Sequence, residues 1–351
     1  MGILDMNTVL RMIFILVVAG LMSYAATPIV RVIAFKIGAV DVPKDERRVH
    51  KKPIARLGGL AIFYGFIVAV FCFCNIDHQL QGILIGAVII VGMGIIDDIR
   101  GIRASIKFLV QIIAAMVVVY HGVKIDNFTN PFGGYIKLGP YAAPITVLWI
   151  VGITNAVNLI DGLDGLAVGI SSITAVTLVT IALITGDYST AMVVLALAGA
   201  GFGFIPHNFF PAKIFMGDTG STFLGFTLGC IAVTGLFKVY AVISFAVPFL
   251  ILALPIFDTG FAIIRRIAKG QSPMAPDRGH LHHRLIDMGF TQKQAVVILY
   301  ITSAMLSMSA VVMMISGALR AVVLILAVII MVLGGKRFIA EAINTEEEKN
   351  D

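Results

Sequence analysis

The amino-acid sequence predicts an all-α polytopic integral membrane protein with about eleven transmembrane helices, or ten if the last two apolar runs form a hairpin of shorter spans. Hydrophobic residues make up 59% and charged residues 13% of the 351 residues, and the mean hydropathy is +0.98. A soluble core cannot bury so large an apolar fraction. Apolar runs of about 18 to 24 residues recur along the chain, and each is long enough to cross a bilayer as a helix.

The breaks between these runs are charged or contain Gly and Pro, and they set the limits of the predicted spans. Residues 124–144 contain Asn-Pro and Gly-Gly turns before an alternating Tyr-Ile-Lys-Leu segment, which predicts a short β-hairpin. The organisation is a single transmembrane domain over residues 1–338 and a polar tail over residues 339–351. The predicted spans are residues 8–28, 57–75, 80–96, 106–121, 143–158, 165–184, 189–206, 220–237, 241–264, 294–316 and 321–335.

The distribution of Lys and Arg predicts an N-terminus outside the cell and a cytoplasmic tail. A dense basic block follows the first span, whereas a signal peptide carries its positive charge before the apolar segment, so we expect an uncleaved span. This orientation places the β-hairpin outside and follows the positive-inside rule. The cytoplasmic segments hold 21 of the 26 basic residues, and they are residues 29–56, 97–107, 207–219, 265–293 and 336–351.

The segment NAVNLIDGLDG, residues 155–165, places two amides and two acids between apolar runs. Carboxylates beside hydrocarbon are costly, so a functional role is the default reading. Asn155, Asn158 and Asp161 are spaced to share one helical face, and Asp164 follows. Such hard oxygen ligands suit Mg²⁺ or Mn²⁺, ions that hold diphosphate oxygens. The alternative is a polar cap on two helices.

Two further acidic sites stand next to predicted spans. Asp97 and Asp98 close the third span. Because adjacent side chains point to different sides of a helix, one can face a ligand while the other bonds a neighbouring helix or a nearby cation, which could be Arg100, Arg103 or Lys107. Asp218 precedes a predicted helix start whose free N–H groups can meet an anion. A solvated helix end and a simple helix cap are the respective alternatives.

The loop over residues 265–293 supplies positive charge. Arg265 and Arg278 can clamp phosphates in the fork geometry that suits guanidinium groups, and His280, His282 and His283 cluster in RGHLHHRL. Contact with a substrate is the favoured interpretation of the histidines. A transition-metal site and an ordinary surface remain alternatives.

These groups, gathered on the cytoplasmic side, indicate a soluble, phosphate-bearing substrate that is brought to a lipid partner, and they give no indication of nucleic-acid binding. A secondary transporter is the alternative from another class. Transport sites belong near the bilayer midplane, whereas here the acids cluster at helix ends, with Asp258 as the deepest exception.

Five ordered blocks resemble the polyprenyl-phosphate N-acetylhexosamine-1-phosphate transferases of glycosyltransferase family 4: DVPKDERRVHKKPIARLGG, GIIDD, NAVNLIDGLDGLA, PAKIFMGDTGS and PDRGHLHHRL. The H-x-H-H form of residues 280–283 resembles the WecA and TagO branch. The resemblance implies transfer of GlcNAc-1-phosphate from UDP-GlcNAc to undecaprenyl phosphate with release of UMP. The related phospho-MurNAc-pentapeptide transferase of peptidoglycan synthesis, which carries an uninterrupted histidine triplet, is the alternative.

The resemblance also implies residue roles. Arg100 follows the acidic pair where the peptidoglycan branch has prominent lysines, which leaves open which cation holds the lipid phosphate. The expected catalytic residues are Asp97, Asp98 and Asp218, with Asp97 and Asp98 close to the lipid phosphate. Asp218, helped by Asn158 or Asp161, would bind Mg²⁺, with Mn²⁺ as the alternative. The other expected substrate-binding residues are Asp164 and Asn208 near the uracil, Arg56 and Lys107, and Arg265, Arg278, His280, His282 and His283 at the diphosphate and sugar.

The implied setting is the bacterial cytoplasmic membrane, which a multi-pass catalytic domain would cross. The implied partners are undecaprenyl phosphate, a UDP-N-acetylhexosamine and the lipid bilayer, and a homodimer is left open. The product would start a cell-envelope glycopolymer such as teichoic acid or O-antigen.

Overall fold

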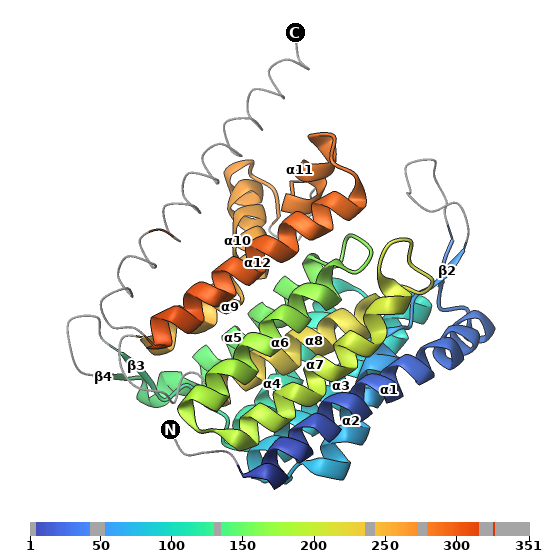
Figure 1. Cartoon of the computed structure of the whole chain (residues 1–351). Coiled ribbons are helices and arrows are strands. Elements are labelled where there is room, and N and C mark those ends of the chain that lie inside the picture. The colour runs from blue at the N-terminus through green and yellow to red at the C-terminus, as the bar shows by residue number, and fades with distance from the viewer. Residues whose placement is uncertain are drawn as a thin grey trace.

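The computed structural model of the chain is a bundle of long helices (Figure 1). It describes residues 5–42, 53–129, 135–235, 243–272, 279–315 and residue 326. The helices are α1 (Met6–Ile37), α2 (Gly59–Phe73), α3 (His78–Arg100), α4 (Ala104–Tyr120), α5 (Ala142–Leu159), α6 (Leu166–Thr185), α7 (Tyr188–Asn208), α8 (Gly217–Gly235), α9 (Ile243–Ile251), α10 (Ala253–Ala268), α11 (Leu281–Asp287) and α12 (Gln292–Ile315), with a short 3₁₀ helix, η1 (Gly139–Tyr141). The strands are β1 (Val40–Asp41), β2 (Ile54–Ala55), β3 (Asn127–Thr129) and β4 (Tyr135–Lys137).

Helices long and apolar enough to cross a membrane confirm a polytopic membrane protein. Within the described residues there are six: α1, α3, α5 together with η1, α6, α7 and α12. The apolar helices α2 and α4 are shorter, at 15 and 17 residues. Of the predicted span over residues 321–335 only residue 326 is described, and the tail over residues 339–351 lies outside the described residues.

Two predicted spans have different limits in the structure. The first was expected to end at Pro28, but α1 continues through this proline to Ile37 and ends at Gly38, whose φ is 81°. Residues 29–37, which are apolar apart from Arg31 and Lys36, thus extend α1 beyond the predicted span. The span expected over residues 241–264 is divided at Leu252 into α9 and α10.

A proline explains the break between α9 and α10. Pro255 has no N–H, so it cannot donate to the carbonyl of Ile251 four residues earlier. The hydroxyl of Thr174, on α6, donates to that carbonyl instead, at 3.3 Å. The break therefore keeps its polar backbone satisfied inside the bundle.

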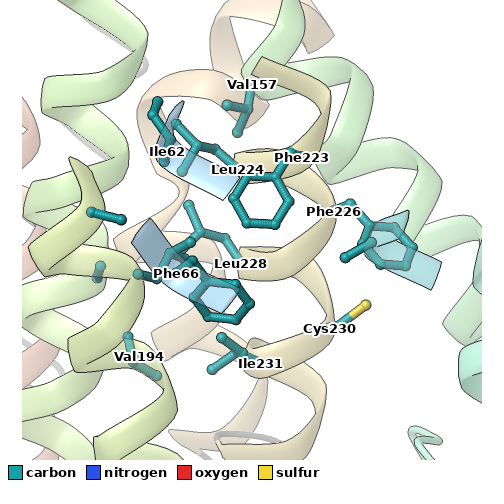
Figure 2. Packing of buried hydrophobic residues seen from close by; sticks show 14 of the residues in the cluster. Ile62, Phe66, Val157, Val194, Phe223, Leu224, Phe226, Leu228, Cys230 and Ile231 are labelled. Carbon is teal, nitrogen blue, oxygen red and sulfur yellow. The ribbon is translucent and has the colours of Figure 1, made fainter. Parts of the chain in front are cut away.

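Helix α8 forms the centre of the bundle. It packs against α2, α3, α5, α6 and α7, and its side chains are buried on every side from Thr219 to Val233. A helix that is apolar all round belongs in such a core. Figure 2 shows Phe223 and Leu228 of α8 packed with Ile62 and Phe66 of α2. The first residues of α8 carry Asp218, one of the predicted site residues.

The β-hairpin predicted within residues 124–144 is present as β3 and β4. The two strands are antiparallel, and Asn127 pairs with Lys137. Figure 1 shows this hairpin at the end of the bundle opposite to α11. The pairing of β1 with β2 was not predicted, because each strand has only two residues.

Candidate functional site

The start of α8 is held by a carboxylate from another helix. Asp98 of α3 accepts hydrogen bonds from the backbone N–H groups of Asp218 (2.9 Å) and Thr219 (3.0 Å), and from the Thr219 hydroxyl (2.7 Å). Its side chain is fully buried. Gly217 has a φ of 71°, and a Cβ there would collide with the Asp98 carboxylate. Asp98 therefore caps α8, and Asp218 is left free to face other groups.

Lys107 connects the other acid of the α3 pair to α8. Its Nζ lies 2.5 Å from Oδ2 of Asp97 and 2.5 Å from Oδ2 of Asp218. The second oxygen of Asp97 accepts a hydrogen bond from the backbone N–H of Ile102 at 2.6 Å. The structure thus brings Asp97, Lys107 and Asp218 together, and it confirms that one acid of the pair bonds a nearby cation.

Arg56 approaches the same carboxylates from the segment that follows β2. Its guanidinium lies 3.3 Å from Asp98 and 3.8 Å from Asp218. Backbone hydrogen bonds from Gly58 and Gly59 to the carbonyls of residues 215 and 216 hold this segment against the start of α8. Arg56 and Lys107 keep 35% and 25% of their side-chain surface exposed, so both cations remain accessible to a phosphate.

The two asparagines of α5 have different neighbours. Asn155 donates to the side-chain oxygen of Gln111 on α4 at 2.5 Å, which ties two helices together. Asn158 donates to the hydroxyl of Ser221 on α8 at 3.0 Å. Within the described residues, no donor meets the amide oxygen of Asn158. This oxygen is therefore available to a ligand.

The spacing predicted that Asp161 shares one helical face with the two asparagines. It does not, because α5 ends at Leu159 and Asp161 lies in the loop that follows. Its carboxylate has neither a hydrogen-bond donor nor an ion-pair partner in the part of the chain that the structure describes. Burial, and then the negative charges of Asp218 and Asp98, raise the pKa of Asp161 to about 8. The positive charge of Arg56 offsets these effects only in part.

Asp164 and Asn208 join the loop between α5 and α6 to the loop between α7 and α8. Asp164 accepts a hydrogen bond from the N–H of Ala212 at 2.9 Å. The buried Asn208 accepts from the N–H of Gly165 at 3.1 Å and donates to a carbonyl of its own loop at 3.0 Å. The hydroxyl of Tyr300 donates to the Gly165 carbonyl at 2.5 Å. Asp164 and Asn208, the two residues expected near the uracil, thus lie where these two loops meet, and their hydrogen bonds hold the backbone of both loops.

The histidine cluster packs against the loop that carries Asp161. His280 and His282 are buried, and His283 is half-buried. The rings of His280 and His282 are stacked, with centroids 5.8 Å apart. A Cβ on Gly162 would collide with Nε2 of His282, so only glycine allows this approach. Burial, together with the charge of His283, lowers the pKa of His282 to about 4, and its imidazole is neutral at pH 7.

The two arginines predicted in the loop over residues 265–293 have different outcomes. Arg265 lies at the end of α10, and its guanidinium packs closely against Gly279, directly before the histidine cluster. Arg278 lies outside the described residues.

The set predicted to bind Mg²⁺ fits an ion that shares its coordination with a substrate. No three His, Cys, Asp or Glu side chains of the described residues are placed to hold an ion by themselves. Mg²⁺ is usually held by one or two carboxylates together with waters and substrate phosphates. The open carboxylate of Asp161 and the open amide oxygen of Asn158, beside Asp218, are suitable ligands of this kind.

Sequence reasoning missed several contacts that build the site. It did not pair Asp98 with Thr219, Asn155 with Gln111, or Asp258 with His280. Only the last pair left a signal in the sequence, because Asp258 is an acid deep in an apolar run. The other pairings depend on which helices are neighbours.

Fold and site together define a polytopic membrane protein that gathers carboxylates, cations and histidines at the ends of its helices, as a protein that binds charged ligands at a membrane surface would. The chain belongs to glycosyl transferase family 4, whose model matches residues 80–236. That range runs from the third residue of α3 to just past the end of α8, and it therefore contains both acidic pairs and Asp218.

The chain is similar to curated proteins over most of its length. A probable undecaprenyl-phosphate N-acetylglucosaminyl 1-phosphate transferase of Bacillus subtilis is 42% identical over 87% of this chain and 85% of its own. A decaprenyl-phosphate N-acetylglucosaminephosphotransferase of Mycobacterium tuberculosis is 36% identical over 81% of this chain and 78% of its own. An undecaprenyl-phosphate alpha-N-acetylglucosaminyl 1-phosphate transferase of Salmonella typhimurium is 33% identical over 79% of this chain and 77% of its own.

Proposed function

We propose that the protein transfers N-acetylglucosamine 1-phosphate from UDP-GlcNAc to undecaprenyl phosphate and releases UMP. The observation that carries this proposal is the 42% identity, over 87% of the chain, to a relative named for this transfer. The site supports it, because Arg56 and Lys107 offer accessible positive charge beside Asp218 at a helix end. A secondary transporter is disfavoured, since the family is one of glycosyl transferases.

The proposed setting is the cytoplasmic membrane of a bacterium, with the site on the cytoplasmic face and the N-terminus outside. The excess of Lys and Arg in the segments on the site's side supports this orientation. Eleven spans then require a further helix over residues 321–335, of which only residue 326 is described. Labelling of Lys124→Cys by a membrane-impermeant reagent in intact cells tests the orientation; labelling only after lysis would overturn it.

The proposed reaction is a single displacement. An oxygen of undecaprenyl phosphate forms a bond to the β-phosphorus of UDP-GlcNAc, while the bond from that phosphorus to the bridging oxygen breaks and UMP leaves with the electron pair. A phosphate monoester has a second pKa of about 6, so the attacking oxygen is largely ionised at pH 7. A strong base is therefore unnecessary, and positioning and charge stabilisation are the main tasks of the protein.

Each group of residues has a part in this proposal. Lys107 and Arg56 bind phosphate oxygens beside Asp218, and the histidines, which pack against the loop 160–165, bind the diphosphate and sugar. Asp218, Asn158 and Asp161 would hold Mg²⁺, or Mn²⁺ in its place, which would supply positive charge for the diphosphate. Asp98 keeps Asp218 in place by capping α8.

The deciding experiment incubates the purified protein with Mg²⁺, undecaprenyl phosphate and a panel of UDP-sugars, and identifies the lipid product by mass spectrometry. We expect a product carrying GlcNAc-1-phosphate. A product formed only from UDP-MurNAc-pentapeptide would favour the peptidoglycan enzyme, and the absence of any lipid product would contradict the proposal.

A second experiment tests the single displacement. A two-step route through a phosphorylated Asp218 or Asp97 would release UMP without any lipid acceptor, or would exchange labelled UMP into UDP-GlcNAc. We expect neither reaction in the absence of undecaprenyl phosphate.

A further inference from the structure

The buried carboxylate of Asp258 has no part in the transfer reaction proposed above. It lies on α10, where its residue is 4% exposed, three positions after Pro255. One carboxylate oxygen lies 2.9 Å from Nδ1 of His280, and the other accepts a hydrogen bond from the backbone N–H of Leu281 at 2.8 Å. Both partners belong to the start of α11, so Asp258 joins α11 to α10.

The bond between Asp258 and His280 selects one form of the imidazole. A carboxylate accepts hydrogen bonds, so Nδ1 of His280 must carry the hydrogen. Nε2 of a neutral His280 is then an acceptor. A carboxylate that bonds one ring nitrogen fixes both the ring orientation and the tautomer, as carboxylates behind metal-bound or catalytic histidines do.

Contacts continue from His280 toward the proposed metal and diphosphate residues. The His280 ring is stacked on His282 with an angle of 9° between the ring planes. His282 in turn lies against Gly162, which adjoins Asp161. Two contacts therefore separate the His280 ring from the loop 160–165.

We propose that Asp258 is a positioning residue. It fixes the tautomer and orientation of His280, and through the stacked His282 it determines where the histidine cluster lies against the loop 160–165. Asp258 itself does not touch the substrate. Its kinetic effect rests on the proposed transfer function, whereas its effect on the His280 tautomer does not.

The test is Asp258→Asn in the full chain. The Asn oxygen can keep the bond to Leu281, which turns the NH₂ group toward Nδ1 of His280 and moves the ring hydrogen to Nε2. The ring ¹⁵N signals of His280 are assigned as those that disappear from the spectrum of histidine-labelled protein in the His280→Gln variant. We expect these signals to show the tautomer change in Asp258→Asn. We expect kcat to fall about 10- to 100-fold, with a smaller change in the KM for UDP-GlcNAc.

A control and a double variant separate positioning from a general structural effect. The control is Asp287→Asn, which removes an exposed acid from α11, the helix whose start Asp258 contacts. This variant should behave like the wild type. If Asp258 acts through His280, adding Asp258→Asn to His280→Gln should cause no further loss. Additive losses, wild-type kcat in Asp258→Asn, or an unchanged His280 tautomer would each overturn the proposal.

The same experiment separates this inference from the proposed function. A wild-type protein that forms no lipid product, while Asp258→Asn changes the tautomer, would support the positioning role and refute the transfer function. A wild type that forms the lipid product, together with an unchanged His280 tautomer in Asp258→Asn, would support the transfer function and refute the positioning role. Should Asp258→Asn fail to fold, Asp258→Glu provides the second variant: restored folding with reduced kcat supports positioning, and wild-type kcat contradicts it.

Discussion

Two acidic pairs stand at helix ends in this protein, and they differ in how their carboxylates are satisfied. On α3, Asp98 caps α8 and Asp97 bonds Lys107 and a backbone N–H, so both acids have partners. After α5, Asp164 accepts a backbone N–H, whereas Asp161 has no donor in the described residues. Carboxylates with partners hold the site together, and the open carboxylate is the one available to a ligand.

Removing Asp98 should have the largest effect. Asp98→Ala leaves the two N–H groups at the start of α8 and the Thr219 hydroxyl without an acceptor in a buried position. We expect a loss of at least about 3 kcal/mol in the free energy of unfolding, and no transfer. Asp77→Ala, which removes an exposed cap of α3 at the opposite end, should cost only about 1 kcal/mol and leave transfer unchanged. Equal effects of the two variants on thermal unfolding would contradict the comparison.

Removing the charge of Asp161 should abolish function without loosening the fold. We expect Asp161→Asn to lower the transfer rate at least about 100-fold, the size seen when a charge-stabilising group is lost. Thermal unfolding of this variant should occur no earlier than in the wild type, because Asp161 has no donor to lose. Asp126→Asn, an exposed acid near β3, is the control and should change neither quantity.

The raised pKa of Asp161 predicts a pH dependence in protein treated with a chelator. Because the folded pKa of about 8 exceeds the ordinary value of 3.8, the folded state holds the proton more tightly, and stability falls as pH rises from about 4 to 8. Asp161→Asn should therefore be more stable than the wild type at pH 8 and equally stable near pH 4. We expect a difference of about 1 to 2 kcal/mol in the free energy of unfolding at pH 8, after allowing for the solvent contact of this half-buried group. Parallel stability curves for the two proteins would contradict this assignment.

Replacing Lys107 should have a smaller effect that Mg²⁺ partly reverses. Lys107→Met leaves Asp97 and Asp218 without the cation that bridges them, and we expect unfolding at a lower temperature by several degrees. Added Mg²⁺ should raise the unfolding temperature more in this variant than in the wild type, because the ion supplies the missing charge. A matched change at the opposite end, Lys124→Met, should show no extra response to Mg²⁺.

Asp164 should be the most tolerant of the four acids to an amide substitution. Asp164→Asn keeps an oxygen that can accept from the N–H of Ala212, so we expect less than about a 10-fold loss in kcat/KM. Asp164→Ala loses the acceptor and should cost about 1 to 3 kcal/mol of stability. If Asp164→Asn were as damaging as Asp161→Asn, the charge of Asp164, rather than its hydrogen bond, would be what the site requires.

The helical architecture could be predicted well from the sequence, and its deviations have local causes. Long apolar runs gave most of the described helices, because a chain in hydrocarbon must satisfy its backbone within each segment. The continuation of α1 past Pro28 and the break at Leu252 were harder to predict. Whether a proline bends or divides a helix depends on which donor meets the freed carbonyl, and Thr174 comes from a distant part of the sequence.

The candidate site was predicted as a set of residues but not as an arrangement. Sequence spacing placed Asp161 on one face with Asn155 and Asn158, whereas the end of α5 at Leu159 moves it into a loop. A nearby cation was anticipated for one acid of the α3 pair, and the structure selects Lys107 from the three candidates Arg100, Arg103 and Lys107. The bonds from Asp98 to Thr219 and from Asp258 to His280 span 121 and 22 residues, and only packing reveals them.

The sequence by itself determined the membrane architecture, the family resemblance and the identity of the polar residues, because apolar length, charge asymmetry and ordered motifs are properties of the chain. Only the tertiary structure decided which of those polar residues have partners. A carboxylate becomes a cap, an ion-pair partner or an open ligand according to which donors the surrounding helices bring to it, and this depends on how α3, α4, α5 and α8 pack around one another.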